Sequence, residues 1–177
     1  MGQIFSIGYG NATSSEIASR LGEFDVRYVV DVRSAPYSKF KPEFSRDALQ
    51  AYLLGFQISY VFMGDLLGGR PRDITCYTDG KVDYEKTKTK PFFLHGIKRL
   101  KTAHSGDYNI CLFCSESEPT HCHRCKLVGE ALKEEGISVT HILPNGDVQS
   151  HVDSILHLNR GQTDMFGEHY MSRKTYI

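Results

Sequence analysis

Apolar and polar residues follow two rhythms along the chain, and each rhythm predicts a different element. Short runs rich in Ile, Val, Phe and Tyr predict five strands, at residues 4–7, 26–32, 58–62, 108–113 and 138–142. The amphipathic stretches between them predict helices at residues 13–21, from 45 onward, at 91–101 and at 121–136. This alternation is typical of a single three-layer α/β domain, in which helices flank a mostly parallel sheet of about five strands.

Single residues predict where these helices begin and end. Thr13, Ser14 or Ser15 can cap the first helix, and Glu16 favours its positive end. Pro91 suits the first turn of the third helix, and Gly136 suits the end of the fourth.

Two segments fall outside the alternation. Residues 70–90 form a polar excursion in which lysines alternate with acids, which is consistent with a lid, a binding loop or a solvated insertion. From about Leu156 the regular apolar spacing is lost. We therefore predict an α/β domain at residues 1–155 and a largely irregular tail at 156–177.

Composition limits the classes of protein to consider. The 177 residues suffice for one core, and the formal net charge of zero gives no global field that would attract nucleic acid. No apolar run approaches the roughly 20 residues needed to cross a bilayer. The first residues lack the basic region of a secretory signal, so we expect a cytoplasmic protein without a membrane partner. Five cysteines in a reducing compartment argue against a disulfide framework and leave burial, catalysis or metal binding.

Polar and glycine-rich loops follow four of the predicted strands. In a parallel α/β sheet these loops emerge at one edge, where ligands usually bind. The loops carry Tyr9 and Asn11; Asp31, Arg33 and Ser34; Gly68 and Gly69; and Cys114, Glu116, Cys122, His123 and Arg124. We expect these residues to converge on one functional site.

The same loops contain several separated motifs in a specific order. They are Ile7-Gly8-Tyr9-Gly10-Asn11, Asp31-Val32-Arg33-Ser34 with Pro36 and Ser38, Leu67-Gly68-Gly69-Arg70-Pro71, and Cys114 with Glu116, Pro119, Cys122, His123 and Arg124. In these motifs the chain resembles the domain-of-unknown-function family 488 of bacteria and archaea, over nearly the whole globular part. The resemblance implies which positions matter; it implies neither a reaction nor a cofactor.

The chemistry of these positions predicts an anion site. Arg33 and Arg124 can form a bidentate clamp, to which Ser34, Gly68, Gly69 and main-chain amides add donors for a phosphate or carboxylate. Asp31, Tyr9 and Asn11 are expected to orient this site. The alternative for Arg33 is a salt bridge to Glu116.

Thiol chemistry is the second feature of the same loops. Arginine and a helix start can stabilise a thiolate at Cys114 or Cys122, with His123 and Glu116 available for proton transfer. This arrangement is faintly similar to rhodaneses and cysteine phosphatases, although their compact cysteine-to-arginine loop is absent. The alternative for Cys114 is a small core residue.

Metal binding is a further alternative, since two Cys-x-x-Cys pairs lie near His121 and His123. On a strand Cys111 and Cys114 face opposite sides, so the full four-ligand zinc set is disfavoured. We predict no cofactor, with zinc as the alternative. A redox pair of Cys122 and Cys125 is disfavoured as well.

The tail contains Gln162, Met165 and Phe166 in a pattern that closely resembles the peptide by which bacterial proteins dock on the replication sliding clamp. Such a segment would insert its two apolar anchors into a pocket. The alternative is that these side chains pack on the protein's own core.

Together these features predict a protein that binds or acts on a phosphate-containing small molecule, a nucleotide or a nucleic acid, in DNA repair or replication. One alternative is a non-catalytic nucleic-acid-associated or clamp-binding module. Another is a thiol-dependent enzyme similar to rhodaneses or phosphatases. The sequence leaves open whether the protein is catalytic.

Overall fold

The computed structural model describes residues 1–159 and 169–177, and a six-stranded sheet in the order β3-β2-β6-β1-β7-β8 forms its centre. The strands are β1 (Ile4–Gly8), β2 (Tyr28–Asp31), β3 (Ser59–Phe62), β6 (Ile110–Cys114), β7 (Val139–Ile142) and β8 (Val148–Ser150). All neighbours run parallel except β7 and β8. The predicted α/β class is confirmed. The additional edge strand β8 is short and half polar, which is why its pattern gave no signal.

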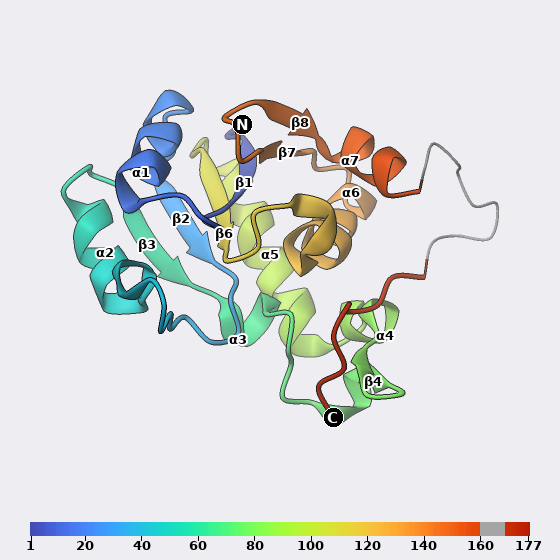
Figure 1. The fold of residues 1–177 in the computed structure, drawn as a ribbon. Helices are drawn as coiled ribbons and strands as arrows, with labels where there is room; N and C mark the ends of the chain where they lie inside the picture. Colours follow the sequence, from blue (N-terminus) through green and yellow to red (C-terminus); the bar gives the residue numbers. More distant parts are fainter. Residues whose placement is uncertain (160–168) are drawn as a thin grey trace.

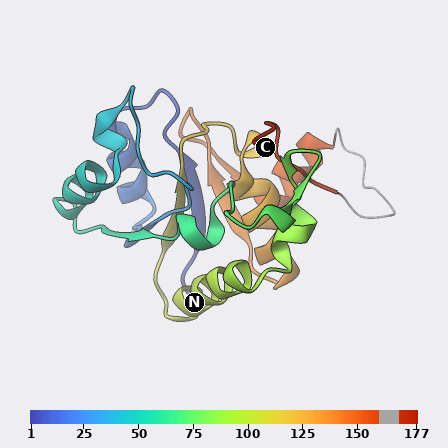
Figure 2. The ribbon, with the colours of Figure 1, turned by 90° about the horizontal axis from the view of Figure 1, so that it is seen from below.

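Helices cover both faces of the sheet (Figures 1 and 2). One layer contains α1 (Ser14–Glu23) and α2 (Arg46–Leu54), and the other contains α3 (Gly64–Leu67), α5 (Pro91–Ser105) and α6 (Glu130–Glu134). Alternate strand residues pack into opposite layers, so Cys111 lies in the core of the α1 layer and Cys114 in the core of the α5 layer. The two cysteines therefore face opposite sides, as the strand geometry predicted.

The helix ends follow the local signals. Thr13 and Glu16 form a reciprocal capping box, with Glu16 N–H donating to Thr13 Oγ1 at 3.2 Å. Pro91 is the first residue of α5, and Gly136 follows α6 with φ of +74°. The single helix predicted at 121–136 is instead a 3-10 turn (Pro119–His121), a π-helix (Arg124–Gly129) and α6. π-helical turns are rare and frequent at functional sites.

The polar excursion and the end of the chain form one assembly. The excursion contains β4 (Tyr77–Thr78), β5 (Lys81–Val82) and α4 (Tyr84–Lys88). Ser172 N–H donates to the Val82 carbonyl at 2.9 Å, and Tyr176 N–H donates to the Gly80 carbonyl at 2.7 Å. Residues 169–177 thus run beside β4 and β5 (Figure 1).

The remaining helix, α7 (His151–Leu158), packs against β7 and β8 and passes the expected start of the tail at residue 156. Gln162, Met165 and Phe166 lie outside the described residues. Among the helices of residues 1–159 and 169–177, none has the length and apolar character needed to cross a bilayer.

Candidate functional site

The carboxyl ends of β1 and β6 lie side by side where the path of the chain across the sheet reverses. From β1 the chain continues through α1 toward β2, whereas from β6 it continues through α6 to β7, on the other side of β1. Loops that diverge to opposite faces at such a point leave a crevice. A cavity of about 410 Å³ lies here, and its lining includes Tyr9, Arg33, Ser34, Gly69, Cys114, Glu116, Cys122 and His123.

Cys122 and Cys114 lie buried in the wall of this cavity, and their sulfur atoms are within 4.8 Å of each other and of a ring nitrogen of His123. The main-chain N–H of Arg124 donates to Cys122 Sγ at 3.5 Å. Burial alone would raise the pKa of Cys122, but a hydrogen bond from the Cys114 thiol and the nearby Arg124 lower that pKa to about 6. The same hydrogen bond, together with burial, raises the pKa of Cys114 to about 12. The two thiols are coupled, so their shared proton favours Cys114 and the negative charge favours Cys122.

His123 has a fixed orientation beside this thiolate. Its Nε2 lies 2.9 Å from the carbonyl oxygen of Val32, and a carbonyl only accepts, so Nε2 carries the proton of the neutral ring. The lone pair is then on Nδ1, 3.7 Å from Cys122 Sγ. A Cβ on Gly69 would lie 2.7 Å from Nδ1, so this glycine makes room for the imidazole. His123 is therefore placed to accept a proton at the thiol.

Arg33 is held by Asp31 rather than by Glu116. Its Nε and Nη2 donate to the two carboxylate oxygens at 2.9 and 2.6 Å, and the Tyr60 hydroxyl donates to the same carboxylate. The guanidinium lies 5.0 Å from the centre of the Phe113 ring. Its Nη1 is buried and has no hydrogen-bond partner in the described part of the chain. A cavity-lining arginine thus retains an unpaired donor, and the expected alternative of an Arg33–Glu116 salt bridge is replaced by the pair with Asp31.

Arg124 does not line the cavity, and its donors are used within the protein. The guanidinium is fully buried; Nε donates to Ser6 Oγ at 3.2 Å, Nη2 to the Ser117 carbonyl at 2.9 Å and Nη1 to the Glu116 carbonyl. The two-arginine clamp predicted from the sequence is therefore not present. Arg124 instead folds the loop after β6 back onto β1, and it acts on Cys122 through its charge and its main-chain N–H.

The other predicted residues lie around or behind the cavity. Ser34 Oγ accepts a hydrogen bond from Arg70 N–H at 2.8 Å, and a Cβ on Gly68 would lie 2.4 Å from the same oxygen. Gly68 thus has a packing role behind the lining. Asn11 lines a separate hollow with Glu16 and Arg20.

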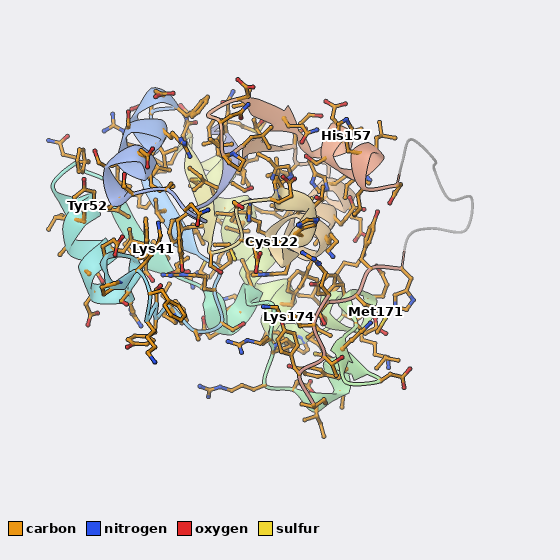
Figure 3. All side chains as sticks on the ribbon, viewed as in Figure 1. Lys41, Tyr52, Cys122, His157, Met171 and Lys174 are labelled. Atoms are coloured by element: carbon orange, nitrogen blue, oxygen red, sulfur yellow. The ribbon has the colours of Figure 1, made fainter. Side chains whose placement is uncertain are left out.

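Part of the cavity wall lies outside the residues predicted for the site. Arg70 belongs to a recognised motif but was not among the predicted site residues, and Tyr37 and His121 lie next to motif residues. The other lining residues come from the excursion and the end of the chain: Tyr84, Ser172, Arg173, Lys174 and Tyr176. Figure 3 labels Lys174 and Cys122, which belong to this cavity although they are far apart in sequence. The basic pair Arg173-Lys174 was the one sequence feature that could have indicated a role for the last residues in the cavity wall. No periodicity connects this pair to the strand ends.

A metal ion could be held in the cavity by Cys114, Cys122 and His123, whose ligand atoms lie within 4.8 Å of one another. The larger set of zinc ligands considered from the sequence does not come together in the structure. Cys111 faces the opposite core, and the Cys125 sulfur lies 3.8 Å from His151 Nδ1, away from the cavity.

Comparisons with known proteins give one match. The model of the family described as domain of unknown function DUF488 matches residues 13–132, which include the described cavity residues from Arg33 to His123. No curated protein and no solved structure gives a significant match. Because the matched range spans more than half of the chain and contains three of the four motifs, the resemblance seen in the sequence is confirmed, and the chain belongs to the DUF488 family.

Proposed function

We propose that the protein is a thiol-dependent enzyme that acts on a phosphate-containing substrate, with Cys122 as its nucleophile. The observation that carries this proposal is the surroundings of Cys122 Sγ: a cavity in front, the Arg124 N–H at 3.5 Å and the acceptor nitrogen of His123 at 3.7 Å. A cysteine that only fills space needs none of these partners, whereas a nucleophilic thiol needs a stabilised anion and access to substrate.

The charges around the cavity support an anionic substrate. Arg33, Arg70, Arg173 and Lys174 line it, against the single carboxylate of Glu116. The buried, unpartnered Nη1 of Arg33 is a donor suited to a phosphoryl oxygen. A cation stabilises a neighbouring anionic group most strongly where water is excluded.

Aromatic side chains at the rim support a nucleotide or nucleic acid as the source of the phosphate. Tyr37 is 74% exposed, and Arg70 lies 5.5 Å from the centre of the Tyr176 ring. Exposed aromatic faces next to cations are the features with which proteins stack bases and track a phosphate backbone.

The chemistry follows from these positions. The Cys122 thiolate attacks phosphorus, an S–P bond forms, and the ester P–O bond breaks. Arg33 neutralises charge on the oxygens that do not react, and the carboxyl group of Glu116, in the cavity wall, passes a proton to the leaving oxygen. Water then attacks phosphorus and cleaves the S–P bond, which restores the Cys122 thiolate. Glu116 takes up the proton that the water loses.

The test uses the full chain with p-nitrophenyl phosphate, bis(p-nitrophenyl) phosphate and a labelled single-stranded oligonucleotide. We expect turnover of at least one of them, loss of turnover in Cys122→Ser, and unchanged turnover in the control Cys76→Ser, a buried cysteine outside the cavity. Thiosulfate serves as a probe for sulfur transfer. Turnover that survives Cys122→Ser would refute a thiol mechanism.

A non-catalytic nucleic-acid-binding module is the second candidate, because the cationic and tyrosine-rich rim does not depend on the thiols. It predicts oligonucleotide binding that is equal in the parent and in Cys122→Ser, with no turnover of any probe. An Arg173→Gln, Lys174→Gln double variant should weaken that binding in either case.

A further inference from the structure

A second group of metal-ligating side chains lies buried outside the cavity. Cys125 comes from the π-helix, His141 from β7 and His151 from the first residue of α7. Their exposed fractions are 0%, 0% and 3%, and their ligand atoms lie within 4.8 Å of one another. The three residues come from three elements that contribute no residue to the described cavity lining.

The spacing of these ligand atoms fits a tetrahedral ion. His141 Nε2 and His151 Nδ1 are 3.1 Å apart, and Cys125 Sγ is 3.8 Å from His151 Nδ1. With Zn–N bonds of about 2.0–2.1 Å and a Zn–S bond of about 2.3 Å, tetrahedral ligands lie roughly 3.3 to 3.6 Å apart. Adjustments of a few tenths of an ångström would therefore accommodate the ion.

The outer nitrogens of both imidazoles are already held. His141 Nδ1 lies 2.6 Å from Ser6 Oγ, and His151 Nε2 lies 2.7 Å from Glu130 Oε1. Metal-binding histidines typically have such an oxygen partner on the second nitrogen, which fixes the ring and aims the first nitrogen at the ion. Here both inner nitrogens are aimed at the same point.

Gly129 makes space for this arrangement. A Cβ at this position of the π-helix would lie 2.6 Å from His151 Cε1 and 2.8 Å from His151 Nδ1. Any larger residue would push the imidazole away from Cys125 and His141.

We propose that Cys125, His141 and His151 form a zinc site that is separate from the cavity. A mixed thiolate and imidazole donor set suits Zn²⁺, and three protein ligands leave its fourth position to a non-protein ligand. The proposal is independent of the function proposed for Cys122.

Zinc binding moves one proton within the site and releases another. Without metal, Glu130 accepts the Nε2 proton of His151, so the proton between the two rings is on His141 Nε2. When the ion binds, that proton moves to His141 Nδ1, and this N–H donates a hydrogen bond to Ser6 Oγ. Cys125 loses its thiol proton to solvent and forms the S–Zn bond. Binding therefore releases about one proton per ion.

The experiment titrates chelator-treated full-length protein with Co²⁺ and then Zn²⁺. We expect a thiolate-to-cobalt absorption band that Zn²⁺ removes, and proton release measured by calorimetry in buffers of different ionisation enthalpy. Cys125→Ser and His151→Gln should lose the band. The matched controls Cys76→Ser and His157→Gln, an exposed histidine on the same helix, should keep it.

The other candidate trio, Cys114, Cys122 and His123, gives a different result. Cys122→Ser should leave the band intact if the proposed site is correct. X-ray absorption of the zinc-loaded parent needs no variant: the proposed site gives one sulfur and two nitrogens, and the cavity trio gives two sulfurs and one nitrogen. Absence of binding in the parent, a two-sulfur shell, or a band lost only in Cys122→Ser would each overturn the proposal.

Discussion

The carbonyl oxygen of Val32 accepts a hydrogen bond of 2.9 Å from Nε2 of His123. This bond connects the end of β2 to the start of the segment that carries Cys122. It leaves Nδ1 as the acceptor facing the thiol, independently of any substrate. His123 Nδ1 is therefore an acceptor that the fold places beside the coupled thiols of Cys114 and Cys122.

The first prediction concerns the reactivity of Cys122 with iodoacetamide. Because its pKa is lowered to about 6, its alkylation rate should be close to its maximum at neutral pH and should fall as the pH drops through that value. Cys114→Ala removes the hydrogen-bond donor, so the midpoint should move to higher pH. Peptide mass spectrometry over roughly pH 5 to 9 measures each cysteine separately. Equal, slow alkylation of all five cysteines would contradict the assignment of a thiolate to Cys122.

The second prediction separates the two arginines. Arg124→Ala leaves buried acceptors at Glu116 and Ser117 unsatisfied, and we expect a loss of about 3 kcal/mol or more in the free energy of unfolding. Arg33→Lys keeps a charge beside Asp31 but removes the planar donors, so it should mainly weaken phosphate binding. Urea denaturation and calorimetric titration with inorganic phosphate measure the two effects. Equal destabilisation by both variants would show that Arg33 is also mainly structural.

The order of the strands could not be predicted from the apolar pattern, although five of the six strands of the central sheet could. The pattern reports which residues are buried, and β1 lies between β6 and β7 because of the way the crossovers pack. The π-helix at Arg124–Gly129 was missed for a similar reason, since a π-turn and an α-turn bury nearly the same residues. This turn contains the fully buried Arg124 and approaches His151 closely at Gly129.

The third prediction compares two glycines. A Cβ at Gly8 would lie 1.7 Å from the Glu116 carbonyl oxygen, so Gly8→Ala should displace the loop after β6 and destabilise the fold by at least about 1–3 kcal/mol. Gly22 lies in α1 with no atom within 4 Å of its would-be Cβ. Gly22→Ala is the matched control and should stabilise the protein by up to about 1 kcal/mol. Thermal unfolding followed by circular dichroism gives both values, and a neutral Gly8→Ala would contradict the close approach of the loop.

The site was predictable to the extent that it lies at strand ends. Arg33, Cys114, Cys122 and His123 follow strands or open the next element, so the rule for parallel sheets brings them together. The rule does not say which way a side chain turns, and Arg124 turns inward to Ser6. Nor does it include Lys174, which reaches the cavity through main-chain pairing of the last residues with β5.

The fourth prediction concerns the segment that contains Gln162, Met165 and Phe166, outside the described residues. If it docks on a bacterial sliding clamp, replacing Met165 and Phe166 with alanine should abolish the interaction, since these are its apolar anchors. Thermal stability and thiol reactivity serve as controls, and both should match the parent if the substitutions act on clamp binding alone. Calorimetric titration of purified clamp distinguishes the cases: no binding by the parent, or equal binding by parent and variant, would eliminate this partner.

Residues 172–176 form one wall of the cavity, yet they are translated after every strand of the sheet. The sheet and the completed cavity wall therefore come from separate stretches of the chain. A polypeptide that stops after α7 would lose Arg173, Lys174 and Tyr176 from the rim, and it would also lose Tyr170, which packs against the core around α5, and the pairing of Ser172 with Val82. We expect such a truncation to change ligand binding and to expose apolar surface around β5 and α4 at the same time, because one segment completes the cavity and covers that part of the core.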